Sequence, residues 1–170
     1  MRPTALFLVT FAFASILLAQ TDVHPNHNHD VTDLIDGAIH PELVPDSTAY
    51  RLFFVATSLP RDATPEDKAQ QKAKLDPIGL NDAEFQVAIG ILDQFKADYS
   101  DLINTYNIQS AAANDQAVPP DFKSFLERRD LLVQITQDSL RSALSAQSFA
   151  HFDTYVQGEK RHMLVNREVQ

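Results

Sequence analysis

The chain has 170 residues, with 14 Lys and Arg against 23 Asp and Glu, which gives a formal net charge of −9 at pH 7. This acidic balance disfavours nucleic acid as a partner, because binding to nucleic acid rests on basic side chains that neutralise phosphates. The absence of cysteine excludes disulfides, thiol catalysis and thiolate metal sites.

Residues 1–19 have the pattern of a secretory signal peptide. Arg2 supplies a positive charge, residues 5–18 form a nearly unbroken apolar run, and Ala19 is a small residue suited to cleavage. The run is shorter than the about 20 residues that a membrane-spanning helix needs. We therefore expect a periplasmic or secreted protein, cleaved near Ala19, with no stable membrane insertion afterwards.

Residues 20–45 are predicted to form a flexible arm and connector that contains His24, His27 and His29. Imidazole is the commonest nitrogen ligand for Zn, Ni and Cu, and His-rich tracts bind metals. The alternative is a solvated tail, since a single flexible cluster lacks the supporting shell that gives a metal site its affinity. We expect no other cofactor.

A single α-helical domain is predicted over residues 46–165, and its first helix covers residues 46–58 with Asp46 as the cap. This helix is apolar around most of its circumference, at Leu52, Phe53, Phe54 and Val55. A helix that is apolar on all sides is normally buried, so the segment is expected to fill the core. The alternative is an exposed contact with a client protein or a second copy.

The next helix is predicted from Thr64, a capping residue followed by proline, to Lys74. Its sequence is highly charged and has no apolar stripe. We expect a marginal helix on the surface.

Residues 81–107 are predicted to form one long amphipathic helix. Its apolar residues recur at steps of three and four, at Phe85, Ala88, Leu92, Phe95, Tyr99, Leu102 and Tyr106. Asn81 is the expected cap, and Glu84 completes a capping-box pattern. At about 1.5 Å per residue the helix would be roughly 39 Å long, so another helix or a second copy must cover its apolar seam.

A loop is predicted over residues 109–119, followed by a second long helix over residues 121–144 and a final helix that starts after Ser145 and reaches about Met163. Residues 166–170 are expected to be a frayed tail. No period-two strand pattern stands out. The predicted fold is therefore all-α, a long antiparallel helical hairpin with shorter flanking helices.

Two helix starts share one pattern, in which a leucine and a capping residue precede two variable residues and a polar residue. The residues are Leu80, Asn81 and Glu84 in one copy, and Leu144, Ser145 and Ser148 in the other. This pattern resembles the LTxxQ motif that occurs twice in the periplasmic Spy/CpxP-like proteins. The resemblance implies a dimeric helical hairpin that shields unfolded clients without ATP, or that senses envelope stress or metal.

The sequence contains a single Glu-x-x-His, at Glu159 and His162, which is half of a di-iron carboxylate signature. Without the second half, we interpret it as a solvated C-terminal turn. The chain also lacks a nucleophile elbow and a glycine-rich phosphate loop. We therefore expect a non-enzymatic protein that binds a protein client, an envelope-stress partner or a second copy of itself. The alternatives are a metal-binding or metal-sensing envelope protein that uses the N-terminal histidines, and a structural helical protein.

Overall fold

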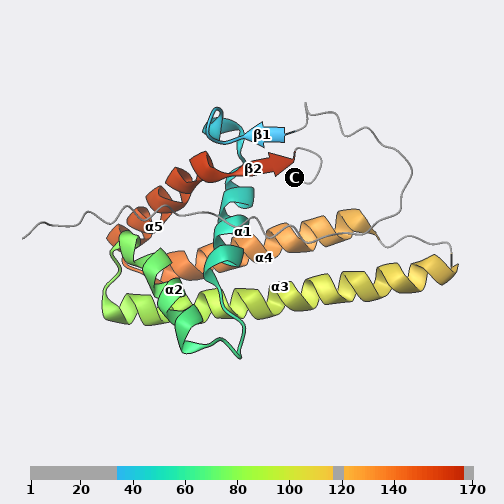
Figure 1. Cartoon of the computed structure of the whole chain (residues 1–170), viewed down its shortest axis with the longest axis horizontal. Coiled ribbons are helices and arrows are strands. Elements are labelled where there is room, and N and C mark those ends of the chain that lie inside the picture. The colour runs from blue at the N-terminus through green and yellow to red at the C-terminus, as the bar shows by residue number, and fades with distance from the viewer. Residues whose placement is uncertain (1–33, 117–120, 167–170) are drawn as a thin grey trace, which may run out of the picture. The chain divides into compact units, whose positions relative to one another are not determined.

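The computed structural model describes residues 34–116 and 121–166. Five α-helices make up most of this part of the chain (Figure 1): α1 (Asp46–Thr57), α2 (Pro65–Leu75), α3 (Asp82–Gln116), α4 (Phe122–Ala143) and α5 (Ala146–Glu159). Between and beside them lie the short strands β1 (Leu34–Asp36) and β2 (Leu164–Asn166) and the 3-10 turns η2 (Pro41–Leu43), η3 (Asp76–Ile78) and η4 (Lys160–His162).

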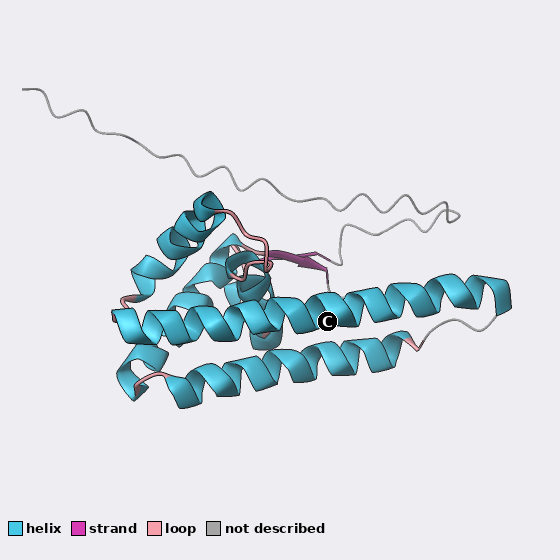
Figure 2. Ribbon diagram, turned by 90° about the horizontal axis from the view of Figure 1, so that it is seen from below, coloured by secondary structure: helices cyan, strands magenta, loops and turns pink. Residues whose placement is uncertain are grey.

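The two longest helices, α3 and α4, run side by side as an antiparallel hairpin in both Figure 1 and Figure 2. The predicted all-α fold with a long helix pair is therefore confirmed. The predicted range of α4 is correct to within one residue at each end. The predicted end of α3 near Asn107 is wrong, since the helix continues to Gln116. The Ser- and Ala-rich sequence there suggested a loop, but alanine is the best helix former.

Helix α1 packs against α3, α4 and α5, so it occupies the centre of the helical assembly. Phe54 is fully buried, and its ring centroid lies 5.2 Å from that of Phe95 on α3. Phe53 is also buried, with its ring centroid 5.4 Å from that of Phe152 on α5. The prediction that α1 fills the core is confirmed.

The alternative interpretation of residues 52–55, an exposed contact, does not describe Phe53 and Phe54, which are only 6% and 0% exposed. Leu52 and Val55 are half-buried and pack against the same core. These side chains are buried because α1 packs between other helices. Helix α5 covers Phe53, and helix α3 covers Phe54.

The predicted cap of α1 needs correction. Pro45, and not Asp46, occupies the cap position of α1. Asp46 is the first helical residue, and its carboxylate accepts a hydrogen bond from the largely buried ammonium group of Lys160. This contact lowers the pKa of Asp46.

Helix α2 begins as predicted, with the Thr64 side chain accepting from the Asp67 amide in a complete capping box. It is less marginal than its composition suggests, because Gln71 and Leu75 are buried. These two residues lie four apart, on the same side of the helix. The amide of Gln71 donates to the carbonyl of Thr57 at 2.8 Å, which ties α2 to the end of α1.

The small antiparallel ribbon of β1 and β2 was not predicted. Ile35 faces Val165 across the ribbon, and both side chains are buried. Strands of three residues are too short to show a period-two pattern. The ordered structure therefore includes Leu34, within the predicted arm, and Asn166, within the predicted frayed tail.

Candidate functional site

The two motif-like helix starts are joined by a single carboxylate, that of Glu84 at the start of α3. Its Oε1 accepts a hydrogen bond from the backbone N–H of Ser145 at 2.9 Å. Its Oε2 accepts from the Ser148 hydroxyl at 2.8 Å and from the Asn81 side-chain amide at 2.7 Å. Asn81 in turn accepts from the Glu84 backbone N–H at 3.0 Å. One side chain thus connects the first turns of α3 and α5.

The predicted cap of α3 is confirmed, because Asn81 accepts from the Glu84 backbone N–H, and the Glu84 carboxylate also reaches the start of α5. In a capping box the side chain of the third helical residue accepts a hydrogen bond from the backbone N–H of its own cap residue. Ser148 holds that position in α5, and its short side chain instead meets the Ser145 hydroxyl at 2.9 Å. Glu84 supplies the missing acceptor from another helix.

The contacts of Glu84 stabilise its ionised form. Hydrogen bonds to the carboxylate lower the pKa of Glu84 to about 2. The backbone N–H of Ser145 makes the largest contribution and the Ser148 hydroxyl the next, followed by the Ser145 hydroxyl and the backbone N–H of Asn81. The two motif leucines support this junction, because Leu144 is buried and Leu80 packs against the same core. The motif residues therefore connect the start of α3 with the end of α4 and the start of α5, and we call this junction the corner of the three helices.

A groove of about 640 Å³ runs along α4, on a side that the hairpin seam does not occupy. Its lining consists of Ser47 from α1 and eight residues of α4: Glu127, Asp130, Leu131, Val133, Gln134, Gln137, Asp138 and Arg141. Leu131 is 55% exposed, and Ile135, one turn further along the helix, is 53% exposed. The groove therefore combines accessible apolar surface with amide and charged groups.

Two lining residues, Gln137 and Arg141, act on Tyr50 of α1, whose hydroxyl donates to a carboxylate oxygen of Asp153 on α5 at 2.6 Å. Burial and this contact raise the pKa of Tyr50, and Gln137 and Arg141 act in the opposite direction. This hydrogen bond joins α1 to α5 near the side chains of α4.

A smaller groove of about 210 Å³ lies farther out on the hairpin, between α3 and α4. The rings of Tyr106, Phe122 and Phe125 gather there, and Phe122 is 44% exposed.

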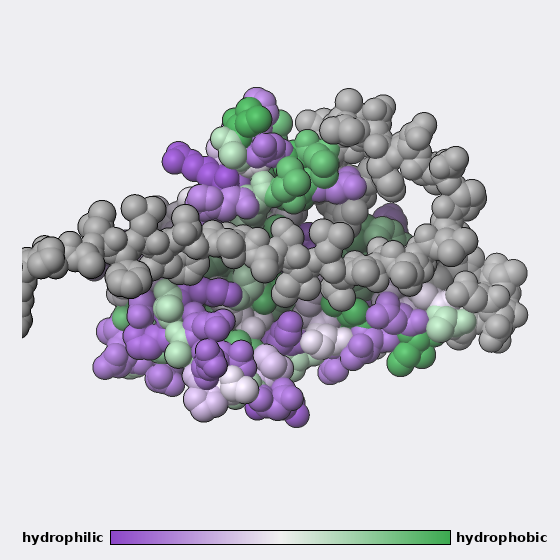
Figure 3. All heavy atoms as spheres, viewed as in Figure 1, coloured by the Kyte–Doolittle hydropathy of each residue, from purple (hydrophilic) through white to green (hydrophobic). Residues whose placement is uncertain are grey.

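Another apolar group lies on the β ribbon, which carries hydrophobic residues on the face shown in Figure 3. On this ribbon the side chain of Leu34 is 46% exposed and that of Leu164 is 65% exposed.

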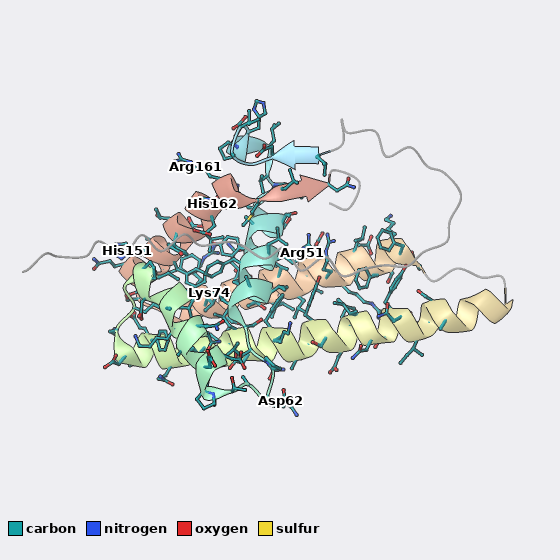
Figure 4. All side chains as sticks on the ribbon, in the orientation of Figure 1. Arg51, Asp62, Lys74, His151, Arg161 and His162 are labelled. Atoms are coloured by element: carbon teal, nitrogen blue, oxygen red, sulfur yellow. The ribbon has the colours of Figure 1, made fainter. Side chains whose placement is uncertain are left out.

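The predicted metal ligands His24, His27 and His29 lie outside the described residues, so the metal site stays a prediction. Within residues 34–116 and 121–166, no group of three His, Asp or Glu side chains is placed to hold a metal ion. Figure 4 shows His151 on α5 and His162 beyond its end, both of them exposed.

Within the described residues, no helix has the length and apolar character to cross a membrane.

Sequence reasoning did not find the groove. Leu131 and Ile135 lie four residues apart, and they are out of phase with the buried positions Val133, Thr136 and Leu140 of α4. That second apolar pair, off the core side of an amphipathic helix, was the available signal.

Comparisons with protein-family models, curated proteins and solved structures found no match to this chain.

Proposed function

We propose that this is an exported, non-enzymatic helical protein of the Spy/CpxP-like kind, which binds exposed segments of unfolded client proteins in the groove along α4. Export is inferred from the signal-peptide pattern of residues 1–19, and the kinship from the repeated motif at Leu80 and Leu144. An envelope-stress partner protein would use the same surface.

The observation that carries the proposal is the exposure of Leu131 and Ile135 beside the groove. Burying a leucine or isoleucine side chain fully contributes about 1.5–3 kcal/mol, and roughly half of this remains for side chains that are 55% and 53% exposed. Two such side chains and a groove provide a weak, reversible site, which suits a protein that must release its clients. The exposed amide of Gln134 can meet the polar backbone of an extended client.

An aggregation assay with a denatured test enzyme tests this proposal. The purified protein at equimolar ratio should slow the aggregation of the enzyme, measured by light scattering. The double variant L131S/I135S should lose most of this effect, because it removes the apolar contacts without touching the buried core.

The matched control is V87S/I108S, which replaces two exposed apolar side chains of α3 that do not line the groove. This control should protect the enzyme as well as the unchanged protein does. Equal loss in both double variants would argue against the groove, and absence of protection by the unchanged protein would remove the proposal.

A further inference from the structure

The groove along α4 contains three carboxylates, and each has a cationic partner within the same helix. The pairs are Glu127 with Lys123 at 3.8 Å, Asp130 with Arg129 at 2.8 Å, and Asp138 with Arg141 at 3.4 Å. Arg141 lines the groove itself, whereas Lys123 and Arg129 lie outside the lining, each within 4 Å of its carboxylate.

Two of the cations are held in place by more than their carboxylates. Arg129 is 3% exposed, so its guanidinium is fixed in the hairpin beside Asp130. The guanidinium of Arg141 lies 5.0 Å from the centre of the Phe149 ring, which keeps it near Asp138. Compensation of charge is therefore built into the fold.

Local neutrality matters because the whole chain is acidic, with a formal net charge of −9. At physiological salt the Debye length is about 8 Å, so acidic groups elsewhere act weakly on a segment bound in the groove. Arg51 projects from α1 in Figure 4, but it is not among the residues that line the groove. Besides these charged groups, a ligand meets Leu131 and the amides of Gln134 and Gln137.

We propose that the groove selects uncharged, leucine-rich segments of unfolded polypeptides over basic or acidic ones. This inference rests on the proposed function and adds the chemical class of segment. A charged segment would lose hydration in the groove without gaining an unpaired counter-charge, whereas an uncharged one can bury apolar side chains and pair its backbone with glutamine amides.

Three fluorescent peptides of equal length test this inference with the full chain. All carry leucine at the same positions, and the remaining positions are all Gln, all Lys or all Glu. Fluorescence anisotropy should show the Gln peptide binding about fivefold or more tightly than either charged peptide at about 150 mM NaCl. Its Kd should change by less than about twofold when the salt concentration is raised.

The variant R141Q leaves Asp138 without its partner, so it should strengthen binding of the Lys peptide and make that binding sensitive to salt. K68Q removes the same charge from an exposed position on α2, outside the groove, and should leave all three affinities unchanged. Circular dichroism checks that both variants remain folded.

Three results would overturn the inference: a preference of the unchanged protein for a charged peptide, equal affinity for all three peptides, or unchanged selectivity in R141Q. If these occur while client aggregation is still suppressed, the proposed function stands and only the selectivity is wrong. If no peptide binds and no client is protected, both fail.

Discussion

At the residue scale, Glu84 shows how one side chain can replace a missing local cap. Its carboxylate accepts from the Ser145 backbone N–H and from the Ser148 hydroxyl, which come from a helix more than 60 residues away. Capping contacts join elements that would otherwise meet only through packing. The corner of α3, α4 and α5 is therefore expected to depend on the ionised form of this residue.

The pH dependence of stability tests this role of Glu84. Its pKa is lowered from 4.5 to about 2 in the folded protein, so its stabilising effect is complete above about pH 4.5 and is lost as the pH falls towards 2. The variant E84Q should lose less stability than the unchanged protein across this range. Urea unfolding at several pH values measures the difference.

E127Q removes the same charge from an exposed position on α4 and is the control. Its stability should follow that of the unchanged protein as the pH is lowered. An identical pH profile for E84Q and the unchanged protein would show that the carboxylate contacts at Ser145 and Ser148 do not contribute.

Glycine substitutions give a second test at this scale. An added Cβ at Gly37 would lie 1.9 Å from the carbonyl oxygen of Lys160, whereas one at Gly90 meets nothing within 4 Å. G37A should therefore lower the free energy of unfolding by about 1–3 kcal/mol. G90A, in the interior of α3, should raise it by about 0.5–1 kcal/mol. Thermal unfolding followed by circular dichroism would contradict this account if both variants shifted in the same direction.

At the element scale, α1 organises the core, because its aromatic side chains contact both the hairpin and α5. The outer part of the hairpin has no such cover among the described residues, and Tyr106 and Phe125 there are only half-buried. The hairpin therefore has a well-packed end beside α1 and a sparsely covered end beyond it.

This difference predicts unequal costs for two phenylalanine truncations. F54A removes a fully buried ring on α1 and should destabilise the protein by about 3–5 kcal/mol. F122A removes a ring that is 44% exposed at the outer end of the hairpin, so its cost should be much smaller. Chemical denaturation of both variants makes the comparison, and similar losses would contradict the central role of α1.

Sequence periodicity was sufficient for the elements whose apolar residues repeat over several turns. The seam from Phe85 to Tyr106 predicted α3 and the need for a covering helix, and α4 was found at nearly its true limits. What the sequence did not show depends on contacts distant along the chain. The link from Glu84 to Ser145 and the pairing of Ile35 with Val165 have no local signal.

At the scale of the whole molecule, we propose that a second copy of the chain covers the outer end of the hairpin. The resemblance to Spy/CpxP-like proteins implies a dimer, and the aromatic rings at Tyr106 and Phe122 offer apolar surface for it. Multi-angle light scattering of the mature protein should then give twice the mass of one chain, and F122S should shift it towards the monomer. A monomer at all concentrations would exclude this assembly.

Photo-crosslinking locates where unfolded clients bind, which we propose is the groove along α4. A denatured client that carries a photoreactive group should crosslink to Ser47 of α1 and to the stretch of α4 from Glu127 to Arg141, as located by mass spectrometry. L131S/I135S should reduce these crosslinks. Crosslinks confined to the β ribbon or to the outer end of the hairpin would contradict the account.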